Sequence, residues 1–285
     1  MTVVINPTKL NRFALKRIAV FGSDEWLANS TKKYRGVFDR AELDYVRCEL
    51  SFYNKVQGNE TWSCNVTFRC YEVMEFGRKE LCTLDNDVQV KPDEHVVFVR
   101  DGWGHTEPGA YWREGKYEWE VLMDGEFLGR ASFLVNDVGR VSNASNPYFS
   151  SESLNLYAGD FEGWKQESRQ YMGTFNGKTT EYVWIEFTLK NKCRRSWNYE
   201  VFFNFYDSAR NLKGQVIREG HVESDREGYS YTFDAGWGNR KPGSWQSEFY
   251  YVDVVFMDTI VASGIFFVRD QDKTGGPNDL FLLRA

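Results

Sequence analysis

The chain has 285 residues, which is enough for two domains that each bury a core of their own. Its formal net charge is −6, and its basic residues are interspersed with acidic ones, so no basic stripe is available to follow a nucleic-acid backbone. It has neither the pattern of a signal peptide nor eighteen consecutive apolar residues. We therefore expect a soluble, cytoplasmic protein that binds neither nucleic acid nor a membrane.

The first half of the chain predicts antiparallel strands. In residues 45–53, Val46, Cys48, Leu50 and Phe52 alternate with polar residues, which is the period of a half-buried strand. Residues 62–71 alternate in the same way. A strand over residues 116–123, a tight turn at Asp124-Gly125 and a strand over residues 127–135 follow.

The second half of the chain repeats the first. Residues 103–124 align without a gap on residues 237–258, and both segments begin with Trp-Gly. Upstream, "YVRCELSFYNK" from Tyr45 matches "YVWIEFTLKNK" from Tyr182, and "WSCNVTFRCY" from Trp62 matches "WNYEVFFNFY" from Trp197. The repeat predicts two homologous domains, residues 1–141 and 142–285, the second with a short C-terminal tail.

These elements together predict an all-β fold. About seven short strands per repeat, separated by turn signals and without a capped helical period, are typical of an immunoglobulin-like antiparallel β-sandwich. The expected architecture is a tandem duplication of two such domains. The shared phrases "GWGHTEPG" and "GWGNRKPG" then have an architectural role: Trp103 and Trp237 turn inward, and each Pro-Gly forms a type II turn.

Motifs that suggest catalysis or cofactor binding fail in their context. "GTFNGKT" from Gly173 has three residues between its glycines where a phosphate-binding loop has four, and a strand follows it instead of a helix. His95, His105 and His221 are far apart in sequence, and Glu49, Glu186, Asp124 and Asp258 occupy expected polar or turn positions that solvation explains. We expect no catalytic residue, cofactor or metal.

The five cysteines have no metal-ligand spacing, and their number is odd. They are Cys48, Cys64, Cys70, Cys82 and Cys193. We expect reduced thiols, with the first three facing the first core because their counterparts Ile185, Tyr199 and Phe205 are large and apolar.

The gapless alignment predicts one difference between the repeats. Polar outer positions of the first domain become apolar in the second, where the predicted partner-binding patch consists of Trp184, Phe202, Val252, Val254 and Phe256. Replacing Val252 and Val254 by glutamate is then expected to preserve the fold and weaken association. The alternative is that these side chains pack against the first domain or under a long loop expected over residues 214–229.

The phrases "YVWIEFTLKNK", "FFNFYDSARNLKG" and "VVFMD" resemble regions that precede the ATPase module in some bacterial AAA proteins related to the sporulation ATPase family. The resemblance implies a cytoplasmic adaptor that recruits partners or substrates. The leading hypothesis is therefore a non-catalytic module that binds another protein or self-associates. The alternative is a carbohydrate-binding protein whose aromatics stack on sugars, or a glycoside hydrolase as a third possibility.

Overall fold

The computed structural model describes residues 12–22, 33–163, 165–270 and 281–283, and the chain divides into two compact units, Met1–Gly139 (unit 1) and Arg140–Ala285 (unit 2). The division lies two residues before the expected boundary after residue 141. Most of the N-terminal segment and most of the C-terminal tail lie outside the described residues. No helix in the described part of the chain is long and apolar enough to cross a membrane.

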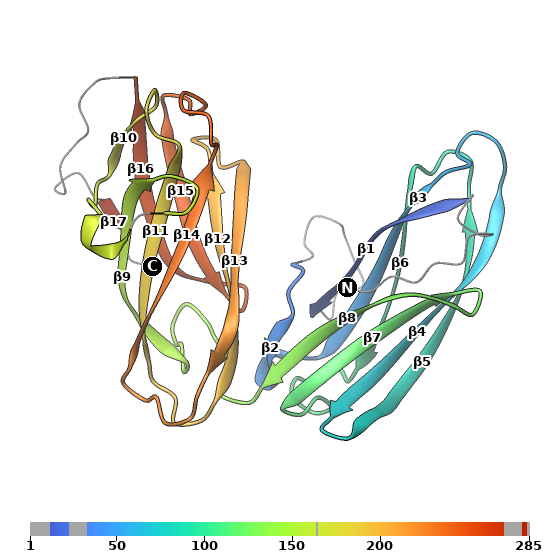
Figure 1. Cartoon of the computed structure of the whole chain (residues 1–285). Coiled ribbons are helices and arrows are strands. Elements are labelled where there is room, and N and C mark those ends of the chain that lie inside the picture. The colour runs from blue at the N-terminus through green and yellow to red at the C-terminus, as the bar shows by residue number, and fades with distance from the viewer. Residues whose placement is uncertain (1–11, 23–32, 164, 271–280, 284–285) are drawn as a thin grey trace. The chain divides into compact units, whose positions relative to one another are not determined.

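Unit 1 is a sandwich of two sheets (Figure 1). The three-stranded sheet has the order β1 (Phe13–Gly22), β3 (Tyr45–Asn54) and β6 (Val96–Gly104). The five-stranded sheet has the order β2 (Val37–Asp39), β8 (Glu126–Asn136), β7 (Gly115–Met123), β4 (Trp62–Met74) and β5 (Gly77–Val90). A 3-10 turn, η1 (Arg40–Glu42), follows β2.

Unit 2 has the same strand order. Its three-stranded sheet is β14 (Ser230–Gly238), β11 (Tyr182–Asn191) and β9 (Phe149–Gly159). Its other sheet is β10 (Thr174–Asn176), β16 (Thr259–Arg269), β15 (Phe249–Phe256), β12 (Trp197–Tyr206) and β13 (Leu212–Val222), and β17 (Phe281–Leu283) also pairs with β16. A second 3-10 turn, η2 (Gln166–Ser168), precedes β10. The all-β sandwich predicted from the sequence is confirmed in both units.

Two details of the topology are shared as well. The short strands β2 and β10 each pair in parallel with the last long strand of their unit, whereas all other pairs are antiparallel. The segment "GTFNGKT" forms strand β10 and the turn after it. Strand β11 follows, as the sequence predicted. The segment of residues 214–229, which the sequence analysis treats as a long loop, instead contributes most of strand β13.

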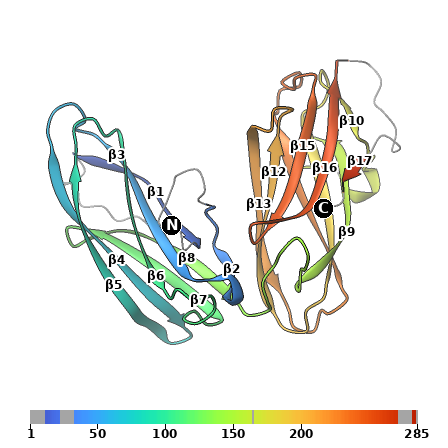
Figure 2. The same ribbon diagram turned by 180° about the vertical axis from the view of Figure 1, so that it is seen from behind.

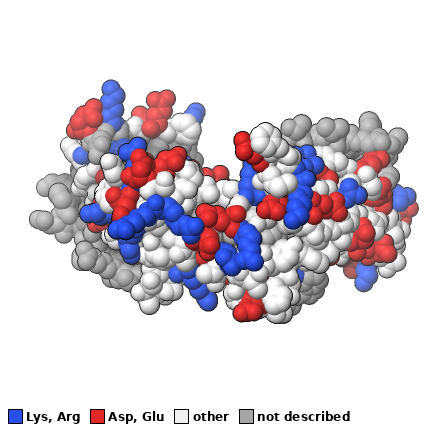
Figure 3. Space-filling view, turned by 90° about the horizontal axis from the view of Figure 1, so that it is seen from below, with Lys and Arg blue, Asp and Glu red and all other residues white. Residues whose placement is uncertain are grey.

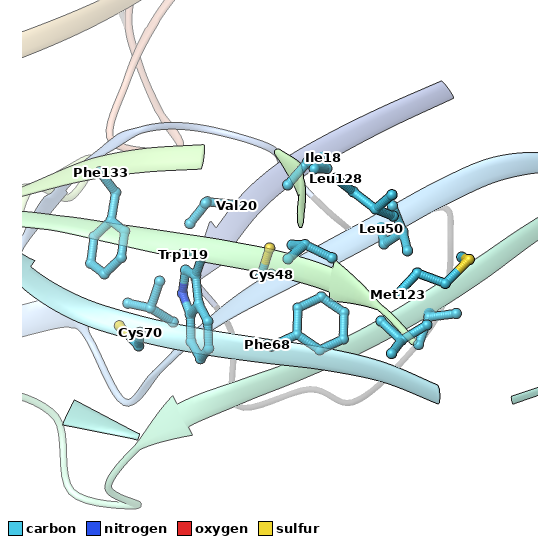
Figure 4. Packing of buried hydrophobic residues seen from close by; sticks show 14 of the residues in the cluster. Ile18, Val20, Cys48, Leu50, Phe68, Cys70, Trp119, Met123, Leu128 and Phe133 are labelled. Atoms are coloured by element: carbon cyan, nitrogen blue, oxygen red, sulfur yellow. The ribbon is translucent and has the colours of Figure 1, made fainter. Parts of the chain in front are cut away.

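The core of unit 1 forms where side chains from both sheets interdigitate (Figure 4). The predicted inward residues Val46, Cys48, Leu50 and Phe52 are all fully buried. From the opposite sheet, the ring of Trp119 packs edge-on against Phe68, with centroids 6.4 Å apart. All five cysteines are free and buried, and Cys48, Cys64 and Cys70 belong to the core of unit 1, as the sequence predicts.

Strands β6 and β14 both end at the repeated Trp-Gly phrase. Steric crowding explains why the last residue of each strand is a glycine. A Cβ at Gly104 would lie 2.0 Å from the Asp44 carbonyl oxygen, and one at Gly238 would lie 2.1 Å from that of Glu181. Each Pro-Gly lies in a turn in which its glycine has a positive φ, +75° at Gly109 and +84° at Gly243. The phrase is therefore architectural in both units.

Candidate interaction surface

The two units differ by one residue in the loop after Pro-Gly, and this shifts the gapless alignment. Val121 pairs with Phe68 across the sheet of unit 1, and Val254 pairs with Phe203 at the same place in unit 2. Tyr117 lies four residues before Val121, and Tyr250 lies four residues before Val254. Tyr117 is therefore equivalent to Tyr250, whereas the gapless alignment matches it to Tyr251. The hydroxyl of Tyr117 donates to the Arg113 carbonyl oxygen at 3.0 Å, and that of Tyr250 to the Gln246 carbonyl oxygen at 3.3 Å, four residues upstream in each case.

The one-residue shift overturns most of the predicted patch. Because successive side chains of a strand point to opposite faces, a slip of one residue exchanges core and surface. Val252, Val254 and Phe256 are 0% exposed and belong to the core of unit 2. Their predicted exposure is wrong, and glutamate at Val252 or Val254 would bury a charge.

The other two predicted residues lie on opposite sheets. Phe202 is on the outer face of the six-stranded sheet, but it is only 8% exposed because it lies between its cross-strand partners Ile217 and Val255. Trp184 lies half-buried on the three-stranded sheet, where its Nε1–H donates to the Asp160 carbonyl oxygen at 2.9 Å. The five residues therefore do not form one patch.

The outer face of the six-stranded sheet of unit 2 is nevertheless apolar, through residues adjacent to the predicted ones. Its strands are seen in Figure 2, which views the molecule from behind. Phe249 is 52% exposed, and its ring lies 4.4 Å from that of its cross-strand partner Phe267. We call the following set the aromatic face: Phe202, Ile217, Phe249, Tyr251, Val255, Ile260, Ile265 and Phe267.

The equivalent face of unit 1 is charged and salt-bridged. The positions of Phe249 and Tyr251 are occupied there by Lys116 and Glu118. Arg78 contacts Glu118 at 2.6 Å and Glu120 at 3.3 Å, while Arg130 contacts Glu118 at 3.4 Å. The contrast between the two faces, which the sequence analysis inferred from the wrong residues, is therefore present.

Charged groups are built into the aromatic face. Asp253 is 6% exposed and accepts hydrogen bonds from Ser263 Oγ at 2.8 Å and from Arg210 at 3.3 Å. The guanidinium of Arg210 also lies 3.7 Å from the centre of the Tyr251 ring, and that of Arg269 lies 4.8 Å from the Phe267 ring. Aromatic and arginine side chains held in this way are the residue types that contribute most to binding at protein interfaces.

Each unit also buries a glutamate on the outer face of its three-stranded sheet, where the sequence analysis expected a solvated residue. Glu49 is 3% exposed; it accepts a hydrogen bond from Tyr34 at 2.5 Å and pairs with Arg100 at 3.2 Å. Glu186 is 5% exposed and is hydrogen-bonded by Tyr171 and Arg169. The prediction of solvation is wrong, because the segment before β2 or β10 covers the glutamate in each unit.

The cluster around Glu186 is a closed ionic network. Arg169 also donates to Asp234, at 2.8 Å and 3.0 Å through its two terminal nitrogens, and its guanidinium lies 4.6 Å from the Tyr157 ring centre. Burial raises the pKa of Tyr157 well above its ordinary value, and the nearby carboxylate of Asp234 adds to this. Each carboxylate has a fixed partner, so the network joins the 165–172 segment to the sheet and offers no free acid–base pair.

Other features give little support to catalysis. In the described part of the chain, no three His, Cys, Asp or Glu side chains gather to hold a metal ion. The aligned aspartates are not equivalent either: Asp124 is the first turn residue of the β7–β8 hairpin, whereas Met257 takes that place before Asp258. Both hairpins turn through two residues with positive φ, which explains the Asp-Gly signal.

A groove of about 400 Å³ lies in unit 2 between the beginnings of β9 and β16. Hydroxyl and amide side chains contribute much of its lining, and Ser151 Oγ donates to the Val261 carbonyl oxygen at 2.8 Å between the two strands. The lining contains neither histidine nor cysteine. On the face of the molecule shown in Figure 3, basic and acidic side chains are interspersed among the described residues.

The comparisons with known proteins add no family. No family model and no curated protein matches the chain. Solved structures with partial likeness include a Paenibacillus cycloisomaltooligosaccharide glucanotransferase (10% identity, TM-score 0.30, 44% of this chain and 14% of that one). Others are a Pseudomonas fluorescens alkylpurine DNA glycosylase (13%, 0.31, 44% and 30%) and a red sea bream transglutaminase (11%, 0.30, 91% and 32%). The chain thus spans less than a third of the length of each of these three proteins.

Proposed function

We propose that the chain is a non-catalytic protein-interaction module, with the aromatic face of unit 2 as its docking surface. The observation that supports this most directly is the contrast between two sheets of one topology. One has an outer face of salt bridges, and the other an outer face of aromatic and branched side chains, with Phe249 52% exposed. An exposed apolar area of this kind is typical of a contact surface.

The resemblance of the strand sequences to regions preceding ATPase modules is the basis for a more specific role. In that role the chain recruits partners or substrates as an adaptor in the cytoplasm. The five buried free thiols are compatible with a reducing compartment.

The proposal is tested by giving unit 2 the residues of unit 1. The double variant Phe249→Lys, Tyr251→Glu replaces two outward aromatics with the residues that the first unit carries at the same positions. The matched control is Lys116→Ala in unit 1, which changes an outer position of the equivalent sheet. Both proteins are compared with the wild type by cross-linking mass spectrometry in cells and by light scattering at increasing protein concentration.

We expect cross-links through β15 and β16, or a concentration-dependent increase in mass, in the wild type and in the control, and their loss in the double variant. Equal cross-links and equal mass in all three folded proteins would show that the face does not bind a protein. A glycan array probed with the same proteins tests carbohydrate binding: a glycan signal that the double variant loses would favour that function instead.

A further inference from the structure

Unit 1 contains two thiols that face each other across neighbouring strands. Cys70 on β4 and Cys82 on β5 are direct partners in the antiparallel ladder. Direct partners in such a ladder have Cα atoms about 4.5–5.5 Å apart. A disulfide spans Cα separations of about 4.4–6.8 Å, so the backbone already has the spacing that the bond requires.

The pair is not required for packing at this place in the fold. In unit 2 the equivalent residues are Phe205 and Gly214, which are also direct partners beside a shift in register. There Trp237 fills the space over the glycine, since a Cβ at Gly214 would lie 2.3 Å from the Trp237 ring. The same topology is therefore stable without thiols, and the cysteine pair is a particular feature of unit 1.

The two thiols have different environments. Cys70 is fully buried and lies among the core residues in Figure 4, whereas Cys82 is 9% exposed and lies on β5, the last strand of the sheet. Its interaction with Cys70 lowers the pKa of the Cys82 thiol, whereas the interaction with Cys82 and burial raise the pKa of the Cys70 thiol. Because the thiolate is the reactive form, Cys82 is the better nucleophile of the pair.

We propose that Cys70 and Cys82 form a dithiol site that hydrogen peroxide oxidises to a cross-strand disulfide. The Cys82 thiolate attacks one peroxide oxygen, the O–O bond breaks, and the departing hydroxide takes up a proton to form water. The Cys82 sulfenic acid is then attacked by the Cys70 sulfur; the S–S bond forms, the S–O bond breaks, and the second oxygen leaves as water with the proton of Cys70. Two thiols and one peroxide thus give one disulfide and two water molecules.

The full chain is treated with hydrogen peroxide, its remaining thiols are blocked with N-ethylmaleimide in denaturant, and the tryptic peptides are analysed by mass spectrometry without reduction. Trypsin cleaves after Arg78, between the two cysteines, so the disulfide appears as two linked peptides. We expect this species to accumulate with peroxide and to disappear on treatment with dithiothreitol. Cys64 is the internal control, because it is also on β4 but faces Val88, and it should remain a blocked thiol.

Two variants assign the roles of the thiols. Cys82→Ser should leave Cys70 unoxidised at the peroxide dose that links the wild type, whereas Cys70→Val should stop Cys82 at the sulfenic or sulfinic acid. The wild-type peptide map decides the proposal even if a variant fails to fold. If both thiols are blocked at all peroxide doses that leave the chain folded, or if Cys82 is overoxidised with no linked peptide, the proposal is wrong.

Discussion

Trp112 and Trp245 occupy the same place in the two units. Each ring packs edge-on against the tyrosine at the same point of the next strand, with centroids 5.1 Å apart to Tyr117 in unit 1 and 5.1 Å apart to Tyr250 in unit 2. These tryptophans lie three residues and two residues after the turn glycines Gly109 and Gly243. Unit 2 is one residue shorter than unit 1 in this turn. The core contacts are the same in both units, while the alignment of the two sequences shifts by one residue.

Trp245→Ala should destabilise unit 2 by about 3–5 kcal/mol, because the change removes a 7% exposed indole and leaves a cavity beside Tyr250. Hydrogen exchange measured by mass spectrometry in urea gives the stability of each unit separately. Phe249→Ala is the control: its side chain is 52% exposed, and the expected loss is about 1 kcal/mol or less. Equal losses for the two variants would contradict the packing described above.

Val254→Glu and Val255→Glu form a matched pair on adjacent residues of one strand. Val254 is fully buried, so a glutamate there should cost about 3 kcal/mol or more, while Val255 points to the outer face and its change should cost about 1 kcal/mol or less. Urea denaturation followed by circular dichroism measures both losses. The opposite ranking would restore the gapless alignment and show that the register derived from the β12–β15 pairing is wrong.

Glu186→Leu should destabilise unit 2 by about 3–5 kcal/mol, because Arg169, whose side chain is 10% exposed, loses one of its two carboxylate partners. Arg169→Met should have a comparable effect, and the double variant should lose less than the sum of the two. A double-mutant cycle in urea measures the coupling. Additive losses would mean that the network does not hold the 165–172 segment to the sheet.

Deprotonation of Tyr250 should lower the free energy of unfolding of unit 2 at alkaline pH. Burial raises the pKa of its hydroxyl from 10.0 to about 12. Between these values the unfolded chain loses the proton while the folded chain keeps it, so the unfolded state binds fewer protons and the free energy of unfolding decreases as pH rises. Below about pH 10 the group contributes no pH dependence.

The measurement for Tyr250 compares urea denaturation of the wild type and of Tyr250→Phe from about pH 9 to about pH 11.5. The variant should show a shallower decrease in stability above about pH 10. Two curves that remain parallel over this interval would contradict the shifted pKa.

Much of the fold follows from local patterns in the sequence. Val46, Cys48, Leu50 and Phe52 alternate with more polar residues, and the structure buries all four. Strand β13 was missed because it is an edge strand with polar and charged residues along its length, so its alternation of exposure does not correspond to an apolar period. Glu49 and Glu186 stand at polar positions, and their burial depends on tyrosines from distant segments, which no local pattern contains.

The sequence by itself determined the all-β class and the inward side of most central strands, and its internal similarity predicted two units, which share one strand order. Only the tertiary structure decided which residues of β15 face water. Val254 and Val255 are equally apolar, and the strand has no strict alternation to separate them. Their sides are set by pairing with Phe203 and Phe202 on β12, and a loop one residue shorter than in unit 1 moves that register by one position. Because each step along a strand reverses the face, one residue in a turn relocates the whole candidate surface.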